Sequence, residues 1–259
     1  MHPAIAPQYQ KSLRNSRDLM SWNNEFKKNG VLVLNEFLHP TAIQSCRSEA
    51  EELSNKAYFK EVNGNIYLCP TDKSWPANHP GLRQERTRVG VVGGDQIPKS
   101  STLQSLFFCN DLREALASIL GKKSLYTYQC PMGFLNYSVM EEGDYLRWHF
   151  DLSDFVLSIP LQEAEEGGLF EYAHKIKNEN SENWSEIHSL LDGDYHKIET
   201  LIAQPGSLIL FEGRHTAHRV SAVRGKTKRL GALLGYVDSP HQGSSPYLRK
   251  IRYGRESCL

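Results

Sequence analysis

The sequence has no excess of charge of either sign, because its 30 lysine and arginine residues balance its 30 aspartate and glutamate residues. Proteins that bind nucleic acid or an anionic membrane surface through charge usually carry a basic excess. The balance therefore argues against nucleic acid and membranes as partners. A length of 259 residues is sufficient for one well-packed domain.

Long apolar runs and cysteine pairs are also lacking. No stretch approaches the ~18 apolar residues that a membrane-spanning helix needs. The first ten residues lack the basic region and apolar run of a secretory signal. The five cysteines are scattered and form no C-x-x-C pair, which argues against a disulfide framework and against a zinc site. Together these absences predict a cytoplasmic protein with reduced thiols.

The first 120 residues show mainly helical patterns. Polar residues 7–30 are compatible with a helix that ends at Asn29-Gly30. Apolar residues recur at helical spacing in two further segments, 41–58 and 103–120. Two short β-type segments are expected among them, at residues 31–34 and, within a loop-rich stretch, at 87–92.

From Ser124 onward the pattern changes to short runs rich in β-branched and aromatic residues. The candidate strands are residues 124–130, 133–139, 144–151, 155–161, 168–173, 196–203, 207–212, 218–223 and 229–237. Turn signals such as Gln204-Pro205-Gly206 separate most of them. This spacing predicts a mainly β fold with flanking helices, whose core is a jelly roll (a double-stranded β-helix, cupin-like).

The predicted organisation is a single domain over residues 1–259. Residues 1–122 would form the helical and loop support and lid, residues 123–240 the jelly-roll core, and residues 241–259 a C-terminal tail. The polar segment 175–195 interrupts the strands, and it is expected to be partly helical and to act as a second lid.

His149 and Asp151 stand two residues apart in the predicted strand Trp148-His-Phe-Asp151. Side chains alternate along a strand, so residues i and i+2 point to the same side, about 7 Å apart. These two residues can therefore bind one metal ion together, with a third ligand from a distant strand. Two histidines and one carboxylate bind one face of Fe(II) and leave three positions open, although the same donors also suit zinc.

Two histidines, His215 and His218, compete for the role of third ligand. Both follow the predicted strand 207–212, but His215 lies in a turn with Gly213 and Arg214. His218 begins a β-compatible run, His-Arg-Val, and is preferred as the ligand. Eleven residues later, Arg229 opens a strand that is otherwise apolar. A guanidinium there needs an anionic partner, and a bidentate carboxylate is the natural one.

The whole series resembles the 2-oxoglutarate-dependent Fe(II) oxygenases over residues 126–236. It consists of His149-x-Asp151, Pro205-Gly-Ser-Leu-Ile-Leu-Phe211, His218-Arg-Val and a basic residue about ten positions later. The resemblance implies that His149, Asp151 and His218 bind Fe(II) and act in catalysis. It implies that 2-oxoglutarate and O₂ complete the site, with Arg229 holding the distal carboxylate of 2-oxoglutarate.

Several phrases are most similar to the free-amino-acid hydroxylases and halogenases, a lysine halogenase-like group. They include Glu165-Glu-Gly-Gly-Leu-Phe-Glu-Tyr172, Phe211-Glu-Gly213 and the tail Ile251-Arg-Tyr-Gly254. In the halogenases of that group a glycine replaces the carboxylate ligand and leaves room for chloride. Because Asp151 occupies this position, the resemblance implies hydroxylation of a free amino acid.

Other residues are candidates for binding the cosubstrate or the substrate. Asn136 is favoured over its neighbour Tyr137 as the residue that faces inward and contacts 2-oxoglutarate, and Tyr128 is a second candidate for that contact. Arg86 and Arg88 could bind a substrate carboxylate, and Trp148 could line the substrate pocket, although alternation turns Trp148 away from the metal. A basic substrate amine could meet an acidic residue: Asp144, Asp154 or Glu171.

The sequence thus predicts an enzyme that hydroxylates an unactivated C–H bond of a free amino acid or similar small molecule, with succinate and CO₂ as co-products. A peptidyl (prolyl-hydroxylase-like) substrate, desaturation and ring closure are the alternatives. A monomer or a homodimer is expected.

Overall fold

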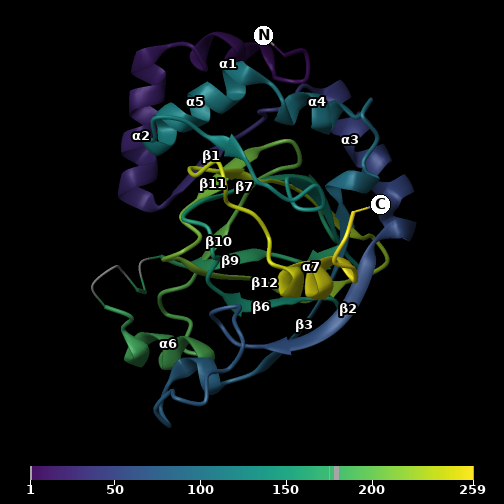
Figure 1. Cartoon of the computed structure of the whole chain (residues 1–259). Helices are drawn as coiled ribbons and strands as arrows, with labels where there is room; N and C mark the ends of the chain where they lie inside the picture. Colours follow the sequence, from purple (N-terminus) through teal and green to yellow (C-terminus); the bar gives the residue numbers. More distant parts are fainter. Residues whose placement is uncertain (1, 175, 178–180, 259) are drawn as a thin grey trace.

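Two antiparallel sheets lie face to face in the computed structural model, which describes residues 2–174, 176–177 and 181–258 (Figure 1). The larger sheet has the strand order β1-β11-β7-β14-β5-β3-β2. Its strands are β1 (Val31–Leu34), β2 (Tyr58–Gly64), β3 (Glu85–Gly93), β5 (Leu135–Met140), β7 (Val156–Gln162), β11 (Leu208–Phe211) and β14 (Arg229–Leu234).

The smaller sheet has the order β10-β9-β12-β6. Its strands are β6 (Leu146–His149), β9 (Phe170–Ala173), β10 (Glu199–Leu201) and β12 (Ala217–Val220). Two short pairs complete the strands, namely β8 (Glu166–Gly167) with β13 (Val223–Arg224) and β4 (Tyr126–Thr127) with β15 (Tyr236–Val237). These antiparallel sheets with flanking helices confirm the predicted fold class.

The helices are α1 (Pro7–Ser12), α2 (Ser16–Asn29), α3 (Pro40–Leu53), α4 (Thr102–Phe107), α5 (Asn110–Leu120), α6 (Trp184–Leu191) and α7 (Pro246–Tyr253), with 3₁₀ turns at Ser54–Lys56, Pro80–Leu82 and Gly94–Gln96. Helices α1 to α5 gather on the outer side of the larger sheet (Figure 1). The prediction of a single helix over 103–120 is wrong, because Cys109, in extended conformation, separates α4 from α5. None of the described helices is long and apolar enough to cross a membrane.

The main core lies between the larger sheet and helices α1 to α5. On β5, Leu135, Tyr137 and Val139 point into this core and are each 0% exposed. The Tyr137 hydroxyl donates to Glu49 Oε1 on α3 at 2.5 Å. Because side chains alternate along a strand, Asn136, between Leu135 and Tyr137, faces the space between the two sheets. The helix-covered face of the larger sheet thus forms the core, and the opposite face is available for a functional site.

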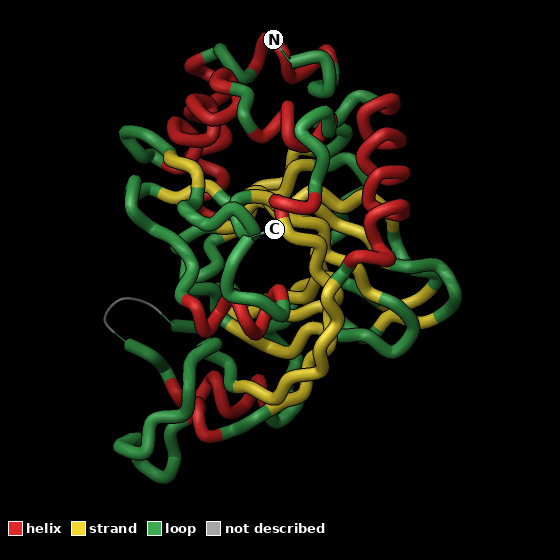
Figure 2. The backbone as a smooth tube through the Cα atoms, turned by 45° about the vertical axis from the view of Figure 1, so that its right-hand side comes forward, coloured by secondary structure: helices red, strands yellow, loops and turns green. Residues whose placement is uncertain are grey.

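Strand β2 and helix α7 were not predicted. Strand β2 pairs with β3 along its whole length, from Tyr58 opposite Val91 to Gly64 opposite Glu85. Helix α7 begins with Ser245, whose side chain accepts from Leu248 N, and ends at Gly254 with φ 72°. A serine cap, an early proline and a closing glycine are the usual helix boundaries, so the signal was present. Helix α7 lies across the opening between the two sheets, beside β2 (Figures 1 and 2).

The described part of the predicted lid 175–195 does not cover that opening; residues 175 and 178–180 lie outside the described residues. Helix α6 buries Ile187, Leu190 and Leu191 in a cluster with Trp148 and Phe150. This cluster lies on the outer side of the smaller sheet. Helix α7, in the predicted tail, is the element that lies over the opening instead.

Candidate metal centre

The three predicted ligands lie together between the sheets. His149 on β6 and His218 on β12 are directly paired across the smaller sheet, and their ring centroids are 4.0 Å apart. Asp151 follows β6, with Oδ1 3.7 Å from His149 Nε2 and Oδ2 3.2 Å from His218 Nε2. All three offer a ligand atom within 4.8 Å of the others. A single ion can therefore bind all three.

Both imidazole rings are held with Nε2 toward the centre. His149 Nδ1 lies 2.9 Å from Arg147 O, and His218 Nδ1 lies 2.9 Å from Thr216 O. A carbonyl oxygen can only accept, so each Nδ1 carries a proton and Nε2 is the atom of each ring that is available to a metal ion. Backbone partners of this kind fix the orientation of metal-binding histidines.

The charge states of the site suit a cation. Burial, followed by the charge of nearby His218, lowers the pKa of His149 to about 3. Burial by itself raises the pKa of Asp151, but His218, His149 and Arg252 oppose it and lower that pKa to about 2. At neutral pH the site thus offers a neutral His149 and an ionised Asp151, without a proton to displace from either.

Asp151 Oδ2 is buried and has no hydrogen-bond partner. It lies 3.2 Å from His218 Nε2, so a metal ion bound by His218 is within reach of this oxygen. A buried carboxylate oxygen without a partner is costly. A divalent ion bound by both atoms removes that cost, and the nitrogen, nitrogen and oxygen donors fit Fe(II).

Gly213 leaves the space that the Asp151 carboxylate occupies. Its carbonyl accepts from Asp151 N at 3.0 Å, and a Cβ at position 213 would lie only 2.6 Å from Asp151 Oδ2. We expect Gly213→Ala to displace the carboxylate and to weaken Fe(II) binding about 10- to 100-fold, the usual effect of disturbing the shell around a metal ligand. Anaerobic iron titration measures this effect, and a thermal unfolding curve of the same variant checks that it is folded. Unchanged iron affinity in Gly213→Ala would contradict the expectation.

Arg229 opens β14 on the side of the sheet opposite its buried neighbour Leu230. Its Nε donates to Gly168 O at 2.7 Å, and a Cβ at Gly168 would lie 2.9 Å from Arg229 Cδ. Burial lowers the pKa of Arg229 to about 10, so the guanidinium remains charged at neutral pH. No carboxylate of the described residues forms an ion pair with it, which leaves the rest of the guanidinium available for an anion.

The structure places the other two cosubstrate candidates differently. Asn136 is buried on the metal side of β5, and its Oδ1 has no hydrogen-bond partner. Tyr128 is half-buried in a cluster with Cys130, Met132 and Tyr253. It therefore packs beside the end of α7, whereas Asn136 faces the space between the sheets. A role for either in holding 2-oxoglutarate stays a prediction.

The predicted substrate residues do not face the metal. Trp148 lies on the outer side of β6 in the cluster with α6 and is 3% exposed. Arg86 is exposed and pairs with Glu61 at 3.1 Å. Arg88 contacts the ring of Phe59 and pairs with Asp144. In the structure these three residues pack or form ion pairs. This corrects the prediction that Arg86, Arg88 and Trp148 contact the substrate.

Arg88 has a structural partner, because Asp144 is 1% exposed. Removing a charged partner from a buried carboxylate costs about 1–3 kcal/mol. We therefore expect Arg88→Gln to lower the free energy of unfolding by that amount and to leave turnover per folded enzyme unchanged. Urea unfolding and turnover together test this expectation; a large rise in substrate KM at unchanged stability would restore Arg88 to the substrate site.

His215 belongs to a separate group of side chains. Its Nδ1 lies 3.2 Å from Glu212 Oε1, and His174 Nε2 lies 3.6 Å from Glu212 Oε2. The neighbouring His174 and His215 lower the pKa of Glu212. Among the described residues this group does not converge as tightly as the triad, so His218, and not His215, belongs to the cluster that could hold a metal ion.

Two facing antiparallel sheets with a His-Asp-His triad between them are characteristic of the 2-oxoglutarate–Fe(II) oxygenases. The chain matches the family model of halogenase D over residues 14–240 and belongs to that family. The predicted resemblance to these oxygenases and to their halogenase-like group is thereby confirmed. The family and the donor set fit an oxidoreductase that uses Fe(II) and 2-oxoglutarate. A comparison with curated protein sequences gives no match.

Solved structures show the same fold at low identity. The carbocyclase SnoK from nogalamycin biosynthesis is 15% identical, with a TM-score of 0.59 and 92% of each chain covered. An oxidoreductase of the 2OG-Fe(II) oxygenase family from Burkholderia pseudomallei is 13% identical, with a TM-score of 0.55 over 86% of this chain and 92% of that one. HygX from Streptomyces hygroscopicus, solved with nickel, 2-oxoglutarate and hygromycin B, is 15% identical, with a TM-score of 0.56 over 85% and 87%.

Proposed function

We propose that this protein is an Fe(II)- and 2-oxoglutarate-dependent dioxygenase that hydroxylates an unactivated C–H bond of a free amino acid or a similar small molecule. The observation that carries the proposal is the complete triad, in which the buried Asp151 Oδ2 has no partner and lies 3.2 Å from His218 Nε2. These two atoms and His149 Nε2 lie close enough together to hold one cation between them.

Each residue of the site has a defined task in this proposal. His149, Asp151 and His218 would hold Fe(II), and Arg229 would hold the distal carboxylate of 2-oxoglutarate. With O₂, iron and 2-oxoglutarate supply the oxidising power, and succinate and CO₂ are released. The chain places the substrate C–H bond near the metal and limits the access of water. Asn136, whose buried Oδ1 has no hydrogen-bond partner among the described residues, would orient the bound cosubstrate.

Hydroxylation is favoured over chlorination by Asp151, although the family is named for a halogenase. A carboxylate ligand occupies the position that a halide would need. The short contact with Gly213 also shows that the chain leaves space for this carboxylate at position 151. We infer that turnover is independent of chloride.

A small substrate is favoured over a peptide by helix α7, which packs against β2 and β3 on the side of the molecule where the two sheets face each other (Figure 1). An extended peptide would need an open groove at that place. Desaturation and ring closure begin with the same removal of hydrogen from a C–H bond, so they are alternative outcomes of the same test.

A succinate-release screen tests the proposal. The protein with Fe(II), 2-oxoglutarate and O₂ is incubated with each free proteinogenic amino acid, with and without chloride, and product masses are measured. We expect one or a few amino acids to stimulate succinate release and to gain one oxygen atom. Loss of two hydrogens would indicate desaturation or ring closure, and a chlorinated product would overturn the hydroxylase assignment. Failure of 2-oxoglutarate to bind the iron-loaded protein would overturn the whole proposal.

A further inference from the structure

Gly231 lies in the middle of β14, a central strand of the larger sheet. Glycine is disfavoured inside a strand, because it has no side chain to pack and loses more conformational entropy on folding than other residues. Two features within a protein commonly explain such a glycine. One is a backbone conformation that other residues avoid, and the other is a neighbouring atom that leaves no room for a side chain.

Neither feature is present at Gly231. Its φ lies outside the left-handed region, so alanine could adopt the same backbone conformation. A Cβ at this position would lie 3.7 Å from Ile159 O and 3.9 Å from Arg229 Nη1, which are ordinary contact distances. Each of the other glycines, all of which the structure describes, has a positive φ or an atom 3.0 Å or less from such a Cβ. Gly231 is therefore a glycine at a position where the protein itself would accept a side chain.

An irregularity in the sheet beside Gly231 does not require glycine either. The register between β14 and β7 shifts at this point, since Leu230 pairs with Gln162 and Gly231 pairs with Pro160. The additional residue is thus Leu161 on β7, and β14 itself is not bulged. Bulges that call for a glycine place it on the bulged strand in the left-handed conformation, which Gly231 does not adopt.

The space beside Gly231 lies on the metal side of the larger sheet. The even-numbered residues of β14 are buried in the main core, so Arg229, Gly231 and Leu233 face the smaller sheet. These three residues are partly exposed, although β14 has a neighbouring strand on each side. The residues that pair with Gly231, Ser138 on β5 and Pro160 on β7, are also partly exposed. Accessible space therefore remains over the centre of this sheet.

Arg229 marks one end of this space. It pairs with Met140 of β5, and Met140 packs in one cluster with Val220 of β12. Val220 lies two residues after the metal ligand His218 on the same strand. Arg229 is therefore level with the part of β12 that lies beyond the metal centre.

The metal centre lies at the other end of this space. The ring centroids of His218 and Phe211 are 4.8 Å apart, and Phe211 pairs with the first residue of β7. The second residue of β7 pairs with Leu234, the last residue of β14. The triad thus faces the end of β14 and Arg229 opens the strand, so Gly231 lies between them.

Both ends of this space are polar, and its middle is not. At the metal end, Asn136 pairs with Leu233 and is 4% exposed, and its Oδ1 has no hydrogen-bond partner among the described residues. At the other end is the guanidinium of Arg229. A buried polar atom without a partner indicates a ligand that is missing from the protein alone. 2-Oxoglutarate has the same order of groups, because two methylene groups separate its distal carboxylate from its 2-oxo acid end.

We propose that Gly231 keeps this space free for the two methylene groups of 2-oxoglutarate and thereby determines which 2-oxo acid the protein accepts as its cosubstrate. This inference rests on the proposed function. A side chain at position 231 fits the protein alone, but it does not fit the protein with its cosubstrate.

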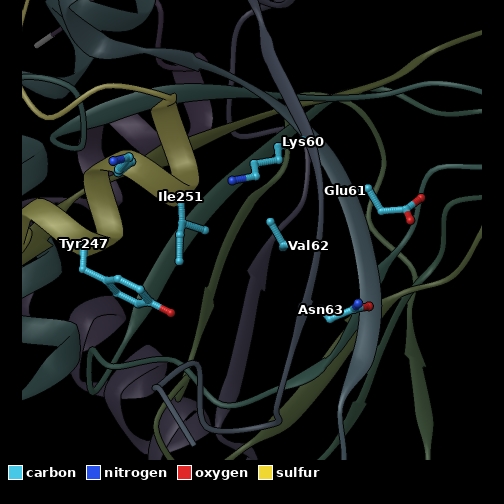
Figure 3. Close-up of a pocket in the computed structure, with 7 residues that line it drawn as sticks. Lys60, Glu61, Val62, Asn63, Tyr247 and Ile251 are labelled. Atoms are coloured by element: carbon cyan, nitrogen blue, oxygen red, sulfur yellow. The ribbon is translucent and has the colours of Figure 1, made fainter.

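The pocket of about 460 Å³ between β2 and α7 is a different place. In Figure 3, Lys60 and Val62 project from β2, and Tyr247 and Ile251 project from α7, into the space between them. Neither a metal ligand nor Arg229 lines this pocket. In the sheet, β5 and β3 separate β14 from β2, so a change at position 231 leaves this pocket unaltered.

The variants Gly231→Ala and Gly231→Val test the proposal. Each protein is loaded with Fe(II) and titrated with 2-oxoglutarate without O₂, and the visible charge-transfer band gives the Kd. We expect Gly231→Ala to raise this Kd at least about tenfold, as overpacking of a filled space does, and Gly231→Val to raise it further. The Tm of Gly231→Ala should be unchanged or higher, because alanine fits the protein and restricts the unfolded chain. Iron affinity should be unchanged.

Pyruvate is the matched control ligand. It has the same 2-oxo acid end as 2-oxoglutarate, but it lacks the second methylene group and the distal carboxylate, so it does not extend to Arg229. We expect its Kd, measured in the same way, to be similar in the wild type and in both variants. The preference for 2-oxoglutarate over pyruvate should therefore fall at least about tenfold in Gly231→Ala.

The failure of the inference and that of the proposed function are distinguishable. If the iron-loaded wild type gives no charge-transfer band with 2-oxoglutarate, the proposed function fails. If the band forms and both variants bind 2-oxoglutarate like the wild type, the function stands and the role of Gly231 is overturned. That role is also overturned if the variants lose both acids equally, or if their Tm or iron affinity falls, because position 231 would then support the fold or the metal centre.

Discussion

Replacement of His218 by alanine is expected to abolish iron binding and all substrate-dependent succinate release. His218 Nε2 and Asp151 Oδ2 face each other at 3.2 Å, so removal of the imidazole leaves Fe(II) with two protein ligands. Loss of an outer partner of a metal ligand already costs about 10- to 100-fold in affinity. Loss of the ligand itself should therefore cost more than about a hundredfold. The same result is expected for His149→Ala and Asp151→Ala.

His215→Ala provides the matched control for His218→Ala. His215 follows the same strand, β11, but contacts Glu212 and not the metal ligands. We expect this variant to retain iron and 2-oxoglutarate binding. Iron content after anaerobic loading, the charge-transfer band and succinate release are measured for both variants, with a thermal unfolding curve as a check of folding. Normal iron binding in His218→Ala, or its loss in folded His215→Ala, would contradict the assigned triad.

The triad could be predicted from the sequence because strand geometry is local. His149 and Asp151 are two residues apart, and alternation puts them on one side. The choice of Asn136 over Tyr137 as the inward residue used the same rule, and in the structure Tyr137 points into the helix-covered core. Side chains alternate along a strand, so the sequence alone predicts which residues share a side of it.

The arginines show where local reasoning fails. Arg86 and Arg88 share one side of β3, as expected, but that side is the wrong one, because Glu61 and Asp144 hold them away from the metal. The sequence could not show these partners, since Asp144 is 56 residues from Arg88. Alternation along the strand predicts that the two side chains lie on the same face of the sheet. Which of the two faces it is depends on the pairing of β3 with β2 and β5.

Helix α7 was missed for a different reason. Its residues read as a short polar tail, and a helix of 8 residues has little intrinsic stability. Packing stabilises it, through Tyr253 in its cluster with Val91 and Met132. The helix was therefore not predicted, although Ser245-Pro246 and Gly254 mark its boundaries.

Replacement of Arg229 by leucine is expected to raise the KM for 2-oxoglutarate at least about thirtyfold. Truncation of one partner of a buried charge pair costs about 2–5 kcal/mol, and about 1.4 kcal/mol corresponds to a factor of ten. Arg229 fits this case because its side chain is half-buried, its pKa is lowered to about 10 by desolvation, and it has only the Gly168 carbonyl as a hydrogen-bond partner among the described residues. Arg229→Lys keeps the charge but loses the bidentate geometry, so its KM should lie between those of the wild type and Arg229→Leu.

The kinetic pattern separates this role from a structural one. Arg224→Gln alters an exposed arginine before the same strand, paired with Glu166 at 3.7 Å, and should leave the KM unchanged. Because the iron ligands are intact in Arg229→Leu, the protein should still bind Fe(II), and a high concentration of 2-oxoglutarate should restore much of the turnover. A variant that loses iron, or whose turnover cannot be restored by 2-oxoglutarate, would indicate that Arg229 supports the fold. Restoration would assign the unpaired charge of Arg229 to the cosubstrate.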